Sequence, residues 1–435
     1  MATFLDLSDI GITISGLDDT PQQSAGYAYL PQDSDPLFGY DAMAVAKLHP
    51  TQINNRFWAD LNTEPSSPTH PKVRHHADLA WFHLKNLKPS FDATDVKMIV
   101  PSSYDEEALQ LLAGVCQSLE INVTAFINRA VASCINYADD QTRFTHVDLQ
   151  QHQTLLTFLE VQDGRLQITE KDQIPATGLI RMQDRWLHVL RQRYITGSRF
   201  DPMHSGETEQ QLFSQLNEFI ADGEKDKFEF TIALDDQNLQ QSFSVDEFTQ
   251  PYKDLLTEIR AKTGDAPLVL DSYFASLPGV NSSENITVAA PKSSLLGAQQ
   301  LLKSDVNSGD EIAYLSSAQM GGTEPHQVTS NDTNATLDTK KLPATHILIQ
   351  GFAYAGNHCH LEVDETALRL VKDNNPDHAH FRYQDEQLEL GPRGFELQIN
   401  QSAGTEGDKL YPGDIISLGK GSEPITAIAL KGMDK

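Results

Sequence analysis

Alternating apolar and polar positions predict strands in two stretches of the first 175 residues. Residues 3–15 are β-branched and alternate, so we expect a strand, a tight turn and the start of a second strand. Residues 144–169 contain one apolar run that ends at Asp148, another that resumes at Leu155, and a third after the turn at Asp163-Gly164. This second stretch therefore predicts two strands followed by a hairpin.

Between and after these strands the apolar positions recur with a helical period. In residues 96–138 a buried strand ends at Val100-Pro101, and a helix follows that Ser102 or Ser103 caps. A short strand at 122–125 leads to another helix that includes Arg129. Further along we expect an amphipathic helix over 178–194, a second helix over 207–223, a hairpin at 228–243 and a third helix that begins at 245.

The last third of the chain has a different pattern. Residues 306–341 are rich in Ser, Asn, Thr, Gly and Asp and contain few apolar positions, which predicts a flexible linker. Residues 342–435 consist of short alternating runs separated by turns, which predicts an all-β domain. We therefore expect three parts: an α/β domain over residues 1–305, a linker over 306–341, and a β-domain over 342–435.

Charge and cysteine content narrow the classes of partner and compartment. The formal charge of −28 disfavours nucleic acid and anionic membranes, which would repel the chain. No apolar run approaches 18 residues, and no basic-then-apolar leader opens the sequence. Cys116, Cys134 and Cys359 lie far apart without paired spacing, which indicates reduced thiols. These features predict a cytoplasmic protein.

The hairpin at 144–169 resembles the phosphate-binding hairpin of the actin and DnaK-like chaperone superfamily, which reads roughly DxGxGTxD. Asp148 matches the aspartate, whereas the turn from Leu149 to Gln153 contains no glycine. The hairpin at 3–15 is similar to the family's first loop, DxGTT. Asp6 matches there, Ser8 and Asp9 replace the Gly-Thr pair, and the added carboxylate of Asp9 would face the phosphates.

The resemblance continues in order to about residue 305. Residues 37–61 resemble the DnaK-like segment after the first hairpin, and ungapped alignment puts Trp58 where that family has a catalytic lysine. Arg129-Ala130 replace a Glu-Pro pair that lines the cleft. Residues 267–279 resemble the adenosine loop, with Asp271-Ser272 in place of two glycines, and 293–302 resemble the closing helix.

This resemblance implies an α/β actin-like ATPase fold, that is, a duplicated ribonuclease H-like fold, for residues 1–305. Glycine in the phosphate loops permits close backbone approach, and three such loops are altered together. We therefore expect a pseudo-ATPase with no catalytic residues, no metal and no bound cofactor, ATP and Mg²⁺ included. The remnant of the nucleotide cleft would be formed by Asp6, Ser8, Asp9, Asp148, Gln150, Asp271 and Ser272.

The tail resembles a forkhead-associated sandwich from His378 onward. His378-Ala379, Ile399-Asn400 and Gly413-Asp414-Ile415 match motifs of that family, while Asn375 stands where it has a phosphothreonine-reading serine. The resemblance implies a peptide-binding loop that contains Asn375, His378 and Asn400. Because the serine is replaced and no arginine can be assigned, we expect phosphothreonine to contribute little to binding.

Two further groups of residues have competing interpretations. His358, His360, His378 and His380 form two i, i+2 pairs, which could bind a metal if their strands were adjacent but are more often separate surface residues. Arg181, Arg185, Arg191 and Arg193 form a basic group on one predicted helix. It is either a solvated face with local acidic partners or a docking patch for an acidic partner.

These observations support one leading hypothesis and two alternatives. The leading hypothesis is a non-enzymatic interaction or scaffold protein, built on a DnaK-like pseudo-ATPase with a protein-binding β-sandwich, whose partner is another protein. The first alternative is a chaperone-like ATPase with divergent nucleotide loops. The second is a phosphothreonine-peptide reader whose α/β part serves as a scaffold.

Overall fold

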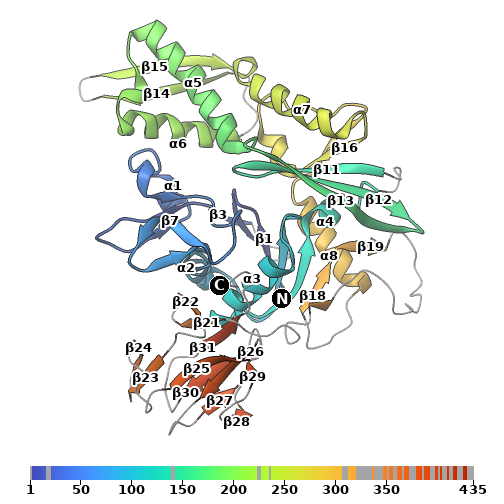
Figure 1. Cartoon of the computed structure of the whole chain (residues 1–435). Coiled ribbons are helices and arrows are strands. Elements are labelled where there is room, and N and C mark those ends of the chain that lie inside the picture. The colour runs from blue at the N-terminus through green and yellow to red at the C-terminus, as the bar shows by residue number, and fades with distance from the viewer. Residues whose placement is uncertain are drawn as a thin grey trace.

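The computed structural model describes residues 2–15, 21–138, 143–222, 227–234, 237–305 and 312–319, and beyond them only strands between residues 336 and 428. Two large β-sheets with helices between and around them, and three small sheets of two or three strands, form the part before residue 320 (Figure 1). One of the small sheets is the predicted hairpin, formed by β14 (Lys227–Ala233) and β15 (Asn238–Ser244). No helix among these described residues has the length and apolar character needed to cross a membrane.

The first sheet begins with the predicted N-terminal hairpin. Its strand order is β3-β2-β1-β9-β10, followed by two short strands from later in the chain. β1, β2 and β3 are antiparallel, whereas β9 runs parallel to β1 and β10 parallel to β9. The bounds of these strands are Thr3–Leu7, Gly11–Ser15, Gln22–Ala25, Val96–Val100 and Val123–Asn128.

The second sheet repeats this arrangement. Its order is β13-β12-β11-β16-β17, with an antiparallel β11-β12-β13 meander and with β16 and β17 parallel to β11. The bounds are Arg143–Leu149, Gln153–Gln162, Arg165–Pro175, Leu268–Leu270 and Ile286–Val288. Asp163 and Gly164 both have positive φ at the β12–β13 turn, so the turn predicted there is confirmed. Strand order and strand direction therefore match between the two halves.

The helices from residue 106 onward lie close to the predicted positions, whereas the two helices before it were not predicted. The helices are α1 (Tyr40–Met43), α2 (His76–Leu87), α3 (Glu106–Ser118), α4 (Arg129–Cys134), α5 (Leu179–Ser198), α6 (Gly206–Asp222), α7 (Gln250–Thr263) and α8 (Ser293–Asp305). The prediction of Ser102 or Ser103 as the cap of α3 is wrong. Asp105 caps this helix, because its carboxylate accepts a hydrogen bond from the amide of Ala108 at 2.9 Å.

A shared core joins the two sheets. One cluster of buried apolar side chains takes residues from β1, β9 and β10 of the first sheet and from β11, β12, β13 and β16 of the second. α4 and α8 lie between the sheets and belong to the same cluster (Figure 1). They approach closely at Gly297, where a Cβ would come within 1.8 Å of the carbonyl oxygen of Ala132. This layer fixes the first turn of α4 next to both hairpins.

The structure differs from the predicted linker at residues 312–319, which we call the strap. β18 (Ile312–Leu315) runs parallel to β10 in the first sheet, and β19 (Ser317–Gln319) runs antiparallel to β13 in the second. Leu315 and Ala318 are 1% and 0% exposed and join the shared core. Composition averaged over 306–341 hides these few apolar positions, so the linker prediction is wrong for the strap.

Every element described beyond residue 336 is a strand, as the alternating pattern predicts. β20 (Thr336–Leu337) pairs with β18 at the edge of the first sheet. The tail strands form a six-stranded sheet, β22-β21-β31-β30-β27-β28, and a five-stranded sheet, β24-β23-β25-β26-β29. β31 (Ile425–Ile428) lies beside α3, and β22 (Phe352–Ala355) lies beside α2 (Figure 1).

Candidate functional site

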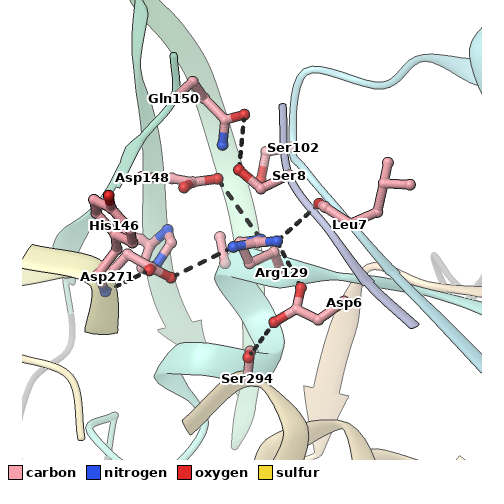
Figure 2. A network of polar contacts seen from close by, with 12 residues as sticks. Asp6, Leu7, Ser8, Ser102, Arg129, His146, Asp148, Gln150, Asp271 and Ser294 are labelled. Atoms are coloured by element: carbon pink, nitrogen blue, oxygen red, sulfur yellow. Dashed lines mark hydrogen bonds and ion pairs between the residues drawn. The ribbon is translucent and has the colours of Figure 1, made fainter. Parts of the chain in front are cut away.

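Three loops that are far apart in the sequence meet at the start of α4. They are the β1–β2 turn, the β11–β12 turn and the residues after β16, and each contains residues predicted from the sequence to line a common cleft. Figure 2 shows the side chains of Asp6, Asp148 and Asp271 around the guanidinium group of Arg129. The structure therefore brings the predicted residues together, but around a cation supplied by the chain itself.

The guanidinium group of Arg129 connects both halves of the molecule. Its Nη2 donates hydrogen bonds to Oδ1 of Asp6 at 2.6 Å and to the carbonyl of Leu7 at 2.7 Å. Its Nε lies 3.8 Å from Oδ2 of Asp148, and its Nη1 lies 3.9 Å from Oδ2 of Asp271. Arg129 is only 6% exposed, so these interactions take place with little solvent screening.

The backbone before Arg129 explains its position. β10 ends at Asn128, whose side-chain oxygen accepts hydrogen bonds from the amides of Ala130 and Val131 and so caps α4. The first helical residue then projects from the end of a buried strand toward the β1 and β11 hairpins. The sequence indicated only that Arg129 replaces a Glu-Pro pair; its role as the centre of the cluster could not be inferred.

The two hairpin turns are hydrogen-bonded directly to each other. Oε1 of Gln150 accepts hydrogen bonds from the hydroxyl of Ser8 at 3.4 Å and from the amide of Asp9 at 3.2 Å. The amide of Gln151 donates to Oδ1 of Asp9 at 2.7 Å, and its side-chain nitrogen donates to the carbonyl of Asp9 at 2.6 Å. Loops that cradle a phosphate offer their amides to the ligand, whereas these loops satisfy each other.

Burial perturbs the ionisation of the whole cluster. It raises the pKa of Asp148 to about 8 against the opposing influence of Arg129, and the neighbouring Asp271 raises it further. Burial also raises the pKa of Asp9 to about 7 and the pKa of Asp6 above its usual range. For Arg129, burial lowers the pKa, but the surrounding carboxylates outweigh burial and raise it overall. Near neutral pH the cluster therefore holds protons as well as one fixed cation.

Several buried polar atoms beside Arg129 have no hydrogen-bond partner among the described residues. They include both carboxylate oxygens of Asp148, Nε2 of Gln150, Nε of Arg129 and both ring nitrogens of His146. His146 lies two residues before Asp148, on the same face of β11, and was not predicted from the sequence. Its Nε2 lies 3.9 Å from Oδ2 of Asp271. Burial lowers the pKa of His146 to about 4, so its ring is neutral at physiological pH.

Ser272 contributes less to this cluster than predicted. Asp271 caps the short 3₁₀ helix η5 (Ser272–Ser276) by accepting a hydrogen bond from the amide of Tyr273 at 3.0 Å. The hydroxyl of Ser272 contacts only Asp271, at 3.5 Å, among the residues around Arg129. Ser294 of α8 was not predicted, and its hydroxyl donates to Oδ2 of Asp6 at 2.7 Å. Its apolar surroundings in the sequence gave no signal for this contact.

A second buried polar group, around His83, has a structural role. Nε1 of Trp58 donates to Nδ1 of His83 at 3.0 Å, so the proton of the neutral ring lies on Nε2, 2.7 Å from the hydroxyl of Ser24. A histidine in this tautomer donates to the serine and cannot remove its proton, which excludes nucleophile activation. Trp58, which the resemblance places at the position of a catalytic lysine in DnaK-like proteins, is 1% exposed and donates a hydrogen bond to His83.

Several of the remaining residues singled out in the sequence cannot be placed. Asn375, His378 and Asn400 lie outside the described residues, as do His358 and Cys359. β23 and β25 are adjacent, with His360 opposite His380 in the register. Within the part of the chain that the structure describes, no group of three or more His, Cys, Asp or Glu residues could bind a metal ion.

The four arginines of α5 have local acidic partners. Arg181 pairs with Glu258, Arg185 with Asp254, Arg191 with Asp201, and Arg193 with Glu247. The interpretation of this group as a solvated face is therefore confirmed. Exposed pairs of this kind contribute about 0–1 kcal/mol each to stability and leave little free positive charge for docking.

Neither a protein-family model nor a curated protein sequence matches this chain.

Proposed function

We propose that this chain is a non-catalytic interaction protein, built on an actin-like fold of the DnaK branch whose nucleotide cleft is closed by its own side chains. One observation carries the proposal: the guanidinium group of Arg129 lies between Asp6, Asp148 and Asp271, where the resemblance implies that metal and phosphates would bind. A cation that is covalently part of the protein neutralises the carboxylates and removes the need for a bound one.

The residues present do not fit Mg-ATP. Phosphate oxygens would meet up to four carboxylates and a single arginine that already donates to Asp6 and Leu7. The backbone amides of Asp9 and Gln151 already donate to side chains of the opposite loop, at 3.2 and 2.7 Å. Binding would therefore require breaking these hydrogen bonds and separating buried ion pairs, at a cost of several kcal/mol.

The repeated strand order of the two halves supports the proposed fold, since the duplicated ribonuclease H-like architecture consists of two such units. The tail, with eleven strands in two sheets, supports the proposed forkhead-associated-like sandwich. We infer that the partner is a second protein, and we assign the chain to the cytoplasm. Nucleic acid and membranes are disfavoured as partners by the charge of −28.

The direct test is titration of the full chain with Mg-ATP. We expect calorimetry to detect no binding tighter than about 1 mM, and 1 mM Mg-ATP to leave the thermal midpoint unchanged. A micromolar dissociation constant would instead stabilise the protein by about 4 kcal/mol at that concentration and would refute the proposal. The double variant Gln150→Gly with Ser272→Gly is the matched comparison. It should also fail to bind tightly, because Arg129 still neutralises the cluster.

A further inference from the structure

The strap pairs with both of the large sheets. Ala313, Tyr314 and Leu315 lie opposite β10 of the first sheet, and Ser317, Ala318 and Gln319 lie opposite β13 of the second. A single extended run of eight residues is therefore hydrogen-bonded to a strand of each half. Any relative movement of the halves must bend the strap or break its pairing with one sheet.

A hydrogen-bonded path leads from the strap to the charged cluster. Nδ2 of Asn128 donates to the hydroxyl of Tyr314 at 3.1 Å, and the hydroxyl of Ser102 donates to Oδ1 of Asn128 at 3.1 Å. Asn128 is fully buried, caps α4 and directly precedes Arg129. The orientation of its side chain therefore sets the start of the helix that carries the guanidinium group.

A second contact links the same C-terminal region to the cluster. Ser294 in the first turn of α8, the helix that precedes the strap, donates to Asp6. Asp6 is also the carboxylate with the shortest contact to Arg129. The strap and α8 thus approach the cluster from two directions, one through Asn128 and one through Asp6.

We propose that the strap is a conformational lock on the cleft: its pairing with both sheets, together with the bond between Tyr314 and Asn128, holds Arg129 among the carboxylates. Displacement of the strap frees the start of α4 and loosens the two hydrogen-bonded turns. The tail follows the strap in the chain, so a force or a binding event at the tail reaches the cleft through these eight residues. This inference does not depend on the proposed absence of ATP binding.

Hydrogen exchange measured by mass spectrometry on the full chain tests the lock with Tyr314→Phe, which removes one hydroxyl and keeps the ring. We expect exchange to rise about fivefold, the equivalent of one neutral hydrogen bond, at residues 5–12, 128–134 and 147–153. Tyr194→Phe is the matched control. Its hydroxyl donates to the carbonyl of Phe230 at 2.6 Å, far from the cleft, and its loss should affect only α5 and β14. Unchanged exchange at the three cleft segments in Tyr314→Phe, or an equal rise in both variants, overturns the proposal.

A crosslink provides a second measurement that keeps Tyr314. Ser317 and Gln167 lie opposite each other in the β13–β19 register, so cysteines at both positions can form a disulfide. Oxidation should slow exchange at the same three segments relative to the reduced protein. The control pairs Gln167→Cys with Glu160→Cys on the other neighbouring strand, β12, and leaves the strap free. If both disulfides form and slow cleft exchange equally, or neither slows it, the strap is not the lock.

Discussion

Replacing Arg129 by methionine isolates the contribution of the internal cation. Methionine keeps most of the apolar length of the side chain but removes the guanidinium group, with its hydrogen bonds to Asp6 and Leu7 and its ion pairs with Asp148 and Asp271. The variant leaves three aspartates that face one another in a buried site without a compensating charge. If the cluster holds the halves together, this one substitution should destabilise the whole α/β part.

The expected size of the effect follows from burial. Removing one partner of a buried ion pair costs about 3–5 kcal/mol, because the other charge stays buried and uncompensated. Here part of the cost is relieved, since Asp148 has a pKa of about 8, already holds a proton for most of the time at pH 7 and adds little negative charge. We therefore expect a loss of about 3 kcal/mol at pH 7, a large share of the roughly 5–15 kcal/mol that stabilises a typical domain.

Urea unfolding monitored by tryptophan fluorescence gives the measurement, with unchanged denaturant slope as the criterion for a comparable transition. Arg143→Met is the matched control. Arg143 pairs with Glu160 at 3.1 Å, but its side chain is 70% exposed, so the loss should stay below about 1 kcal/mol. Adding Asp148→Asn to Arg129→Met should recover part of the stability. Equal midpoints for Arg129→Met and Arg143→Met would refute the role of the cluster.

Two further predictions concern pH and proteolysis. The raised pKa values of Asp9 (about 7) and Asp148 (about 8) mean that the folded protein retains protons that the unfolded chain has released. Stability should therefore fall as the pH rises from about 4, the usual carboxyl value in the unfolded chain, to about 8, by at most about 1.4 kcal/mol per pH unit for each group, and Asp148→Asn should flatten this dependence in urea unfolding. Below about pH 6.5 three histidines with lowered pKa values, the half-buried His75 and the buried His83 and His146, act in the opposite sense because they resist protonation in the folded state, so the fall should be steepest between about pH 6.5 and 8. A stability that rises steadily to pH 8 would contradict this account. Limited proteolysis should cut first within 320–341, where the sequence is poor in apolar residues, and spare the strap; a first cut between 312 and 319 would contradict its placement in both sheets.

The hydrophobic pattern was sufficient for most of the elements. The hairpins at 3–15 and 144–169 and the helices of the second half were predicted because each buries one periodic face. The cap of α3 was misassigned, since Ser102, Ser103 and Asp105 are all good N-caps and only the backbone geometry decides among them. The strap was missed because two buried residues, Leu315 and Ala318, do not alter the composition of a 36-residue window.

The sequence predicted many of the residues that form the site, but not that an arginine of the chain lies among its carboxylates. Motif resemblance identified Asp6, Asp9, Asp148 and Gln150, which do lie close together in the two hairpins beside Arg129. It could not show that Arg129 occupies the centre of the cluster, since Arg129 and Asp6 are 123 residues apart in the sequence. The contact of Gln151 with Asp9 was likewise missed, because a glutamine in a turn is ordinarily a solvated residue.

The position of the strap in the sequence also affects the order in which the sheets can form during synthesis. β10 ends at Asn128, but β18, the strand that covers its free edge, is complete only at Leu315, about 190 residues later. At roughly 5–20 residues per second, the ribosome needs about 10–40 s to add them. Over that interval the nascent first sheet presents an uncovered β10 edge, the kind of strand edge that pairs with other chains. In the second sheet, β13 likewise stays uncovered until β19, at the end of the same eight residues, has been synthesised. Both β10 and β13 therefore gain their outer neighbours late and close together in time, and a chain that stops before residue 312 leaves both strands uncovered.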